Sequence, residues 1–381
     1  MISPSLYIHV PFCRHRCGYC NFALIANRDD LIDRYLAALK IEMDCFELFE
    51  QVSTIFLGGG TPSHLSGDQL TKLFEIIHAR FNVANDAEVT IECNPSDVDA
   101  ERASLFGSLG VNRISLGVQS VNSEKLQLLE RDHRIEKIRE AVELARQVTE
   151  NVSLDMIFGT PGESVASWLS DLRVAIELQP AHMSTYELTI EKGTQFWNRN
   201  NRGTLDRPDE DVLAEMYERT LESLDEQGFQ QYEISSFAKP GHECKHNVTY
   251  WNGQPYLAFG PGAARFYNAT REQNHRSTTT YLKLVETARS AVVERETLDR
   301  NSLALDRVVF GLRQIAGFSR ADFERDFDTD PQRLLGDIGS MLASGELIEW
   351  NVEDCRLTRQ GILMYDSIVD QIVAHSSGWR M

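Results

Sequence analysis

Short β-branched runs alternate with amphipathic stretches at helical spacing through the first half of this 381-residue chain. The runs predict strands over 6–10, 53–57, 88–92, 113–118, 152–158 and 183–188. The stretches between them predict helices over 31–49, 68–81, 100–109, 134–148 and 165–178. Such alternation is typical of parallel strands covered by helices, and six successive β/α units favour a partial (β/α)6 barrel.

The pattern changes after residue 190, which divides the chain into a barrel (1–190), an extension (191–300) and a small C-terminal domain (301–381). In the extension, 192–207 resembles a loop, 208–228 a helix with a Pro start and a Gly stop, and 231–237 an added strand that caps the sheet. Segment 241–275 is rich in Gly, Pro, Asn, His, Tyr and Trp, a composition that predicts a long binding loop.

Beyond residue 300, three helical segments precede a short β pair, 347–352 with 355–358. This order is similar to a small winged-helix α+β domain, whose usual role is nucleic-acid binding. The net charge of −19 and the scattered Lys and Arg residues argue against that role, so no nucleic acid is expected as a partner. No secretion signal or long apolar run is present, which predicts a cytoplasmic protein.

Three of the seven cysteines, Cys13, Cys17 and Cys20, fall within eight residues. The spacing C-x3-C-x2-C allows three thiolates to surround one metal centre, and in a four-iron cluster it would leave one iron open. A zinc site completed by His9 or His15 is the alternative, and the triplet alone leaves both open. The other four cysteines are scattered singly, which is not a disulfide framework.

Glycine-rich or polar residues follow several predicted strands, among them Gly59, Gly60 and Thr61 after the second and Gln119 after the fourth. In parallel α/β folds ligands bind at the carboxyl ends of strands, so these positions are expected to converge on one mouth. A backbone without side chains, as at the glycines, allows a ligand to approach closely.

The segment YIHVPFCRHRCGYC, followed by FLGGGTP, resembles the radical S-adenosylmethionine (SAM) superfamily. The resemblance implies that Cys13, Cys17 and Cys20 ligate a [4Fe–4S] cluster whose open iron is chelated by SAM. It also implies a low-potential electron donor, because the family cleaves SAM reductively to methionine and a 5′-deoxyadenosyl radical.

The resemblance narrows to the coproporphyrinogen dehydrogenase-like branch and covers nearly the whole chain. The residues at that branch's SAM-contacting positions are Tyr7, Tyr19, Gly59, Gly60, Thr61, Glu92, Gln119, Arg131 and Asp155. Their chemistry suits the ligand, since Glu92 and Asp155 can accept from ribose hydroxyls or lie near the sulfonium. Arg131 can pair with a carboxylate, and Tyr19 can cover the adenine.

Within this branch, the porphyrinogen-oxidising enzymes have a fourth cysteine, in a pattern that resembles C-x3-C-x2-C-x-C. They also carry a long segment before the cluster. Here Phe22 stands at the fourth cysteine's position and twelve residues precede Cys13, which favours the branch's haem chaperone family. The segment HNVTYW matches the HNxxYW motif of that family. It implies that His246 ligates or touches haem iron and that Tyr250 and Trp251 present flat faces to the porphyrin.

The resemblance therefore implies a haem chaperone that binds haem and transfers it to acceptor haemoproteins, respiratory and membrane-associated ones among them. Its cofactors would be the cluster, SAM and haem, without porphyrinogen oxidase activity. His242, Cys244 and His275 compete with His246 as iron ligands. Two alternatives stay open: an oxygen-independent coproporphyrinogen III dehydrogenase, and a nucleic-acid-binding radical SAM protein based on the C-terminal domain.

Overall fold

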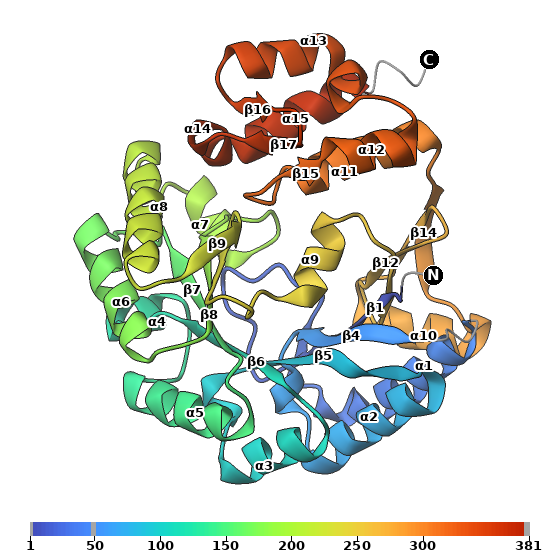
Figure 1. The fold of residues 1–381 in the computed structure, drawn as a ribbon. Helices are drawn as coiled ribbons and strands as arrows, with labels where there is room; N and C mark the ends of the chain where they lie inside the picture. Colours follow the sequence, from blue (N-terminus) through green and yellow to red (C-terminus); the bar gives the residue numbers. More distant parts are fainter. Residues whose placement is uncertain (1–2, 47–50, 377–381) are drawn as a thin grey trace.

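The computed structural model describes residues 3–46 and 51–376, and twelve of its strands form one curved sheet (Figure 1). Their spatial order is β14-β13-β12-β11-β1-β4-β5-β6-β7-β8-β10-β9. The six strands predicted in the first half are confirmed as β1 (Ser5–Val10), β4 (Val52–Gly59), β5 (Val83–Cys93), β6 (Arg113–Gln119), β7 (Val152–Phe158) and β8 (His182–Glu187). Neighbours among these six pair in parallel, as a partial barrel requires.

Helices cover the outer face of the parallel strands (Figure 1). The five predicted helices are confirmed as α1 (Ile32–Asp44), α2 (Gly67–Arg80), α3 (Ala100–Ser108), α5 (Ile135–Val148) and α6 (Val165–Glu177). The first prediction extended to residue 49, and its last three residues lie outside the described ones. Shorter helices follow individual strands: η1 (Asp29–Leu31), η2 (Pro62–His64), η3 (Pro95–Asp97) and α4 (Ser123–Leu128).

Two predictions for the extension are wrong in detail. The segment 192–207 contains α7 (Gln195–Asn201), which begins where the Thr194 side chain accepts a hydrogen bond from the Trp197 N–H. The single strand predicted over 231–237 is instead an antiparallel pair, β9 (Gln230–Glu233) and β10 (Ser236–Ala238), because the chain reverses between them. The helix predicted over 208–228 is confirmed as α8 (Glu210–Asp225).

The long loop predicted over 241–275 is also wrong, because this segment forms a helix and three strands. They are α9 (Lys245–Trp251), β11 (Tyr256–Phe259), β12 (Ala264–Tyr267) and β13 (Thr270–Asn274), followed by α10 (Thr278–Ala288) and β14 (Val292–Thr297). β11 pairs in parallel with β1, and β12 to β14 continue the sheet antiparallel. Its polar composition misled the prediction because cross-strand partners stabilise the polar strand β13: Glu272 pairs with Arg265 and Arg295.

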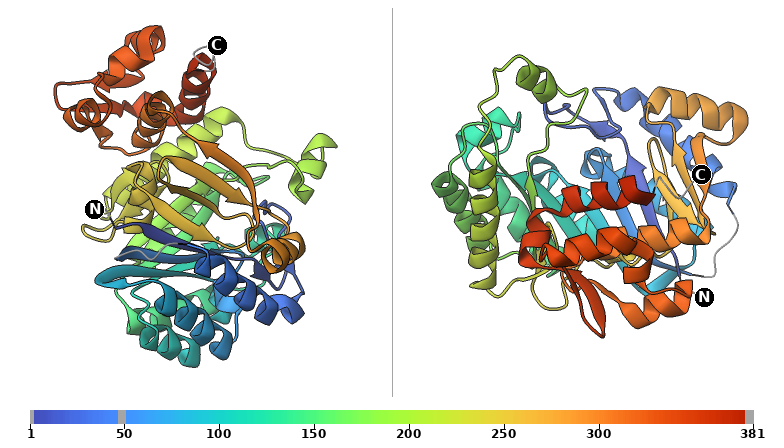
Figure 2. Two further views of the ribbon diagram at one scale, coloured as in Figure 1. Left: turned by 90° about the vertical axis from the view of Figure 1, so that its right-hand side faces the viewer. Right: turned by 90° about the horizontal axis from the view of Figure 1, so that it is seen from above.

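The C-terminal region has a three-stranded sheet and five helices, and it packs over α9 and β9 (Figures 1 and 2). Its elements are α11 (Arg300–Gly311), β15 (Phe318–Ser319), α12 (Arg320–Phe327), α13 (Pro331–Ser344), β16 (Ile348–Trp350), β17 (Asp354–Leu357), α14 (Arg359–Leu363) and α15 (Tyr365–Ser376). The predicted β pair is confirmed, with β15 added beside β17. A separate apolar core from Ala304 to Ile372 supports our proposed boundary near residue 300. No helix in the described ranges has the length and apolar character needed to cross a bilayer.

A buried carboxylate joins the strands of the extension to the barrel. Glu42, on α1, is 2% exposed. It accepts hydrogen bonds from Arg265 (3.2 Å), Asn274 (2.6 Å), Tyr281 (2.7 Å) and the backbone N–H of Gly260 (3.1 Å). Since these partners come from β12, β13, α10 and the turn after β11, one side chain anchors the last part of the extension.

We expect Glu42→Ala to lower the free energy of unfolding by about 3 kcal/mol or more, because buried donors lose their acceptor. Denaturant titration followed by circular dichroism measures this loss. Glu286→Ala is the control, since its ion pair with Arg34 also joins α10 to α1 but is exposed, and it should cost less than about 1 kcal/mol. Equal losses in the two variants would contradict the anchoring role.

Candidate functional site

A cavity of about 830 Å3 opens at the carboxyl ends of β4 to β7, and we call it the cluster cavity. The loop that follows β1 brings the cysteines to it, through β2 (Phe12–Cys13), which pairs in parallel with β3 (Ile25–Ala26). Eleven of the fifteen predicted site residues line it: Cys13, Cys17, Tyr19, Cys20, Gly59, Gly60, Thr61, Glu92, Gln119, Arg131 and Asp155. The expected convergence of these side chains is therefore present in the fold.

The three cysteines line this cavity with different partners. The Cys13 thiol shares a 3.2 Å hydrogen bond with the Thr61 hydroxyl, and Arg131 Nη1 lies 3.9 Å from Cys17 Sγ. Burial raises the pKa of Cys13 to about 11 and also raises the pKa of Cys20. These two thiols are therefore protonated at neutral pH in the absence of metal, and metal binding would release protons.

The histidines considered as zinc ligands lie in different places. His9 lies on the wall of a second cavity, where its ring nitrogens contact the Tyr7 hydroxyl (3.1 Å) and the Ala23 carbonyl (2.8 Å). His15 lines the cluster cavity and pairs with Glu130 at 2.6 Å. Within residues 3–46 and 51–376, no three His, Cys, Asp or Glu side chains are grouped so as to hold one metal ion.

Gly59 and Gly60 are required by close backbone packing. Gly59 has a φ of +109°, and a Cβ there would lie 2.6 Å from the His9 ring. A Cβ on Gly60 would lie 2.8 Å from the carbonyl oxygens of Val10 and Phe12. The Gly60 N–H donates to the Val10 carbonyl, so the end of β4 lies directly against the start of the cysteine loop. These glycines therefore shape the protein around the cysteines, and the approach of a ligand to them stays a prediction.

Two partly buried carboxylates, Glu92 and Asp155, line the cluster cavity beside the end of β4 and on β7. Burial and the neighbouring Asp155 raise the pKa of Glu92 to about 7, and burial raises the pKa of Asp155. Glu92 accepts a hydrogen bond from the Gly59 N–H (3.1 Å), and the Ser115 hydroxyl lies 3.0 and 3.1 Å from the two Asp155 oxygens. A cation beside these carboxylates would favour their ionised forms.

Arg131 provides the complementary charge in the same cavity. Its Nη2 donates to the Gly117 carbonyl at 2.7 Å, while its Nε is buried without a hydrogen-bond partner in the part of the chain that the structure describes. Gln119, on the same wall, has a φ of +65°, which is uncommon for a residue other than glycine and marks a constrained position. The cavity therefore offers both anionic and cationic groups, as a sulfonium amino acid such as SAM requires.

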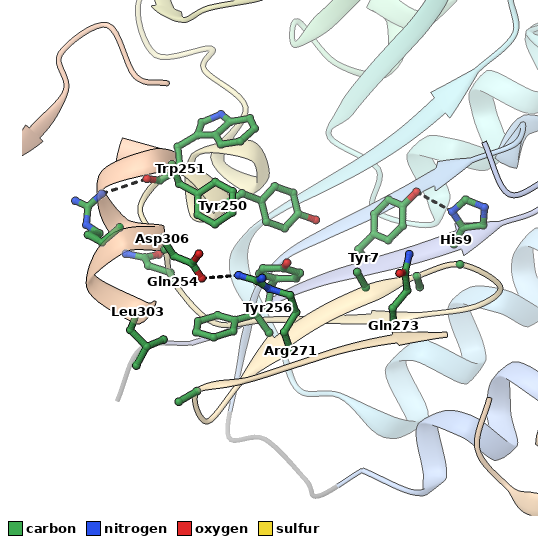
Figure 3. A pocket seen from close by; sticks show the side chains of 18 of the residues that line it. Tyr7, His9, Tyr250, Trp251, Gln254, Tyr256, Arg271, Gln273, Leu303 and Asp306 are labelled. Carbon is green, nitrogen blue, oxygen red and sulfur yellow. Dashed lines mark hydrogen bonds and ion pairs between the residues drawn. The ribbon is translucent and has the colours of Figure 1, made fainter. Parts of the chain in front are cut away.

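The second cavity, which we call the aromatic cavity, has a volume of about 670 Å3 and lies between α9, β11 to β13 and the helices α11 and α12 (Figure 3). Its aromatic lining consists of Tyr7, Phe22, Tyr250, Trp251, Tyr256, Phe266, Phe310 and Phe327. Phe22 and Arg276 lie on the walls of both cavities, which are therefore adjacent. Its size falls within the range of about 300–1,000 Å3 that is usual for ligand sites.

The predicted haem motif is split by the structure. Tyr250 and Trp251 line the aromatic cavity, whereas His246 lies behind it on α9 and is 1% exposed. The ring nitrogens of His246 contact the hydroxyls of Thr54 (2.6 Å) and Tyr250 (2.7 Å). Burial lowers the pKa of His246 to about 3, so its imidazole is neutral at physiological pH. Its role as a haem contact stays a prediction, and it requires the imidazole to leave these two hydroxyls.

A further placement differs from what the motifs suggest. Tyr7 lies on the aromatic cavity rather than the cluster cavity, so its predicted contact with SAM has no support from its position.

Sequence reasoning missed Tyr256, Phe266, Arg271 and Phe310 on the aromatic cavity. For the first three, the signal was the group of aromatic and basic residues within 256–271, which the prediction of a loop obscured.

Comparison with known proteins identifies the family. The sequence model of the Radical SAM superfamily matches residues 7–175. The protein named heme chaperone HemW of Lactococcus lactis is 34% identical over 97% of this chain and 97% of its own length. The Bacillus subtilis protein of the same name is 35% identical over 96% of this chain and 97% of its own. The chain belongs to the HemW family.

A solved structure shows the same fold as this HemW family member. Coproporphyrinogen III oxidase (HemN) from Escherichia coli superposes with a TM-score of 0.86 and 24% identity, over 97% of this chain and 90% of that one. At this identity the likeness shows the fold alone. Membership of the radical SAM superfamily implies a [4Fe–4S] cluster and SAM, and the cluster cavity has the thiols and charged groups to fit them.

We expect Gly60→Ala to lose most of the iron and sulfide of anaerobically prepared protein, because the added methyl group would displace the backbone that leads to Cys13. Iron and sulfide analysis measures the loss, with a Cys13, Cys17 and Cys20 triple replacement by Ala as the reference without cluster. Gly107→Ala is the control, since its Cβ would meet only Val148 at 3.8 Å. Full iron and sulfide content in Gly60→Ala would contradict this role.

Proposed function

We propose that this chain is a cytoplasmic haem chaperone, which binds haem and transfers it to acceptor haemoproteins while holding SAM on a [4Fe–4S] cluster. The observation that carries the proposal is the aromatic cavity beside the cluster cavity, with Phe22 on the walls of both. Phe22 stands where the oxidising enzymes have a fourth cysteine, so an apolar ring replaces a thiol between the cavities. The names of the HemW relatives, which are similar along their whole length, support the same function.

In this proposal Cys13, Cys17 and Cys20 ligate the cluster, which supplies an open iron site for the amino and carboxylate groups of SAM. Arg131 is placed to pair with a carboxylate through its unpartnered Nε, and Glu92 and Asp155 lie where a ribose or a sulfonium would be bound. The remaining proposed contacts on the cavity wall are Tyr19, Gly59, Gly60, Thr61 and Gln119. A low-potential electron donor completes the proposed partners.

Haem is proposed to occupy the aromatic cavity, with Tyr250 and Trp251 against the porphyrin face. Tyr250 packs edge-on against Tyr256, with ring centroids 4.6 Å apart, which gives the wall a fixed aromatic surface. His246 lies directly behind Tyr250 and could reach haem iron only after a local rearrangement. The C-terminal domain contributes Phe310 and Phe327 to the opposite side, a role in ligand enclosure rather than in nucleic-acid binding.

Assays of haem transfer and of porphyrinogen turnover distinguish a haem chaperone from a coproporphyrinogen III dehydrogenase. We expect reconstituted, anaerobic protein loaded with haem to transfer it to an apo-haemoprotein, followed by the Soret band of the acceptor. The same protein, given coproporphyrinogen III, SAM and a reductant, should form no protoporphyrinogen IX. Turnover to protoporphyrinogen IX without haem transfer would overturn the chaperone proposal.

The role of His246 is tested by comparing a variant of His246 with a variant of its neighbour Tyr250. If the imidazole ligates haem iron, His246→Ala should weaken haem binding and shift the Soret band while the iron–sulfur absorption persists. Tyr250→Phe should then retain the ligand and its spectrum, because it removes only the hydroxyl that contacts the imidazole. His242→Ala is the control. If His246→Ala keeps the wild-type spectrum and affinity, His246 is a structural residue of α9.

A further inference from the structure

The aromatic cavity has a local charge opposite to that of the chain. Its lining contains three arginines, Arg271, Arg276 and Arg307, and one aspartate, Asp306, with no lysine or glutamate. Three positive charges less one negative charge give the lining residues alone a net charge of +2, in a chain whose net charge is −19. A largely aromatic cavity with two excess positive charges suits a flat apolar ligand that carries two anionic groups.

Arg271 is the arginine of this lining that already holds a carboxylate. It lies on β13, and its guanidinium pairs with the carboxylate of Asp306 on α11 (Figure 3). The side chains of Arg271 and Asp306 are 38% and 32% exposed, and a second carboxylate, Glu296, lies 3.9 Å from the guanidinium. Burial raises the pKa of Asp306, which indicates that its charge is poorly solvated at this wall.

Arg307, the next residue on α11, also lines the aromatic cavity. Its Nη1 donates to the Trp251 carbonyl at 3.2 Å, and its guanidinium lies over the Phe318 ring. A guanidinium has five N–H donors, so this contact leaves others for a ligand. Since Asp306 and Arg307 are consecutive, the C-terminal domain presents one negative and one positive group to the same cavity.

We propose that Arg271 and Arg307 form a carboxylate-binding subsite in the aromatic cavity, which selects tetrapyrroles with free propionates. Asp306 pairs with Arg271 until a propionate displaces it. This inference rests on the proposed haem binding and adds which part of the ligand is recognised. The geometry supports a charge-assisted pair with Arg271, because the Asp306 carboxylate already contacts its Nη2 in this position. Displacement also breaks an ion pair between β13 and the C-terminal domain.

Protoporphyrin IX and its dimethyl ester test the subsite without iron, since they differ only in the two carboxylates. Fluorescence titration of the full-length protein measures both affinities. The wild-type chain should bind the acid about tenfold more tightly than the ester, as expected for a charge-assisted contact. Arg271→Gln and Arg307→Gln should each remove most of this preference, and Asp306→Asn should strengthen acid binding by freeing Arg271. Binding of the ester should be the same in all of these proteins.

The opposite effects expected for Arg271→Gln and Asp306→Asn on acid binding distinguish a ligand-binding role from a purely structural ion pair. If the Arg271–Asp306 pair only holds the C-terminal domain to the sheet, Arg271→Gln and Asp306→Asn break it equally and change binding in the same direction. Arg295→Gln is the control, since this exposed residue on β14 pairs with Glu272, away from the cavity. Equal affinity of the wild-type chain for acid and ester overturns the subsite alone. Failure to bind haem at all overturns the proposed function on which it rests.

Discussion

Strand β1 pairs in parallel with β4 on one side and with β11 on the other, and the cysteine loop begins where this strand ends. The β4 side leads to Gly59 and Gly60, whose missing side chains let the end of β4 pack against the loop. The β11 side leads to the strands that line the aromatic cavity. One central strand therefore lies between the elements that lead to the two cavities.

The two cavities differ in charge although they share a wall. The cluster cavity contains the partly buried carboxylates Glu92 and Asp155, which favour a cationic ligand group, whereas the aromatic cavity has an excess of arginine. Burial makes this difference matter, because electrostatic interactions are stronger where water is excluded. The arrangement suits a sulfonium on one side and propionates on the other. In this proposal, the charges of the walls keep the two ligands in separate sites.

The C-terminal domain has a winged-helix-like order of elements but uses it to close a cavity. Its first helix, α11, contributes Leu303, Asp306, Arg307 and Phe310 to the aromatic cavity. Hydrogen bonds from Arg307 and Gln314 to the Trp251 carbonyl join the C-terminal domain to α9. The domain therefore faces the haem motif with the residues that would hold a ligand, and its contacts with β13 include the ion pair that we propose is exchanged on binding.

The sequence by itself determined the six parallel strands and the five covering helices through strong local periodicity, and its short motifs identified the three cysteines and the glycine turn. The other residues of the cluster cavity were expected from the family resemblance. Only the tertiary structure decided the extension: β11 and β13 are short or polar and become strands through pairing with β1 and β14. It also decided that His246 lies behind Tyr250 while Arg271 faces Asp306. Those relations join residues that are distant in the sequence or depend on which face of α9 is buried, and local patterns carry no information about either.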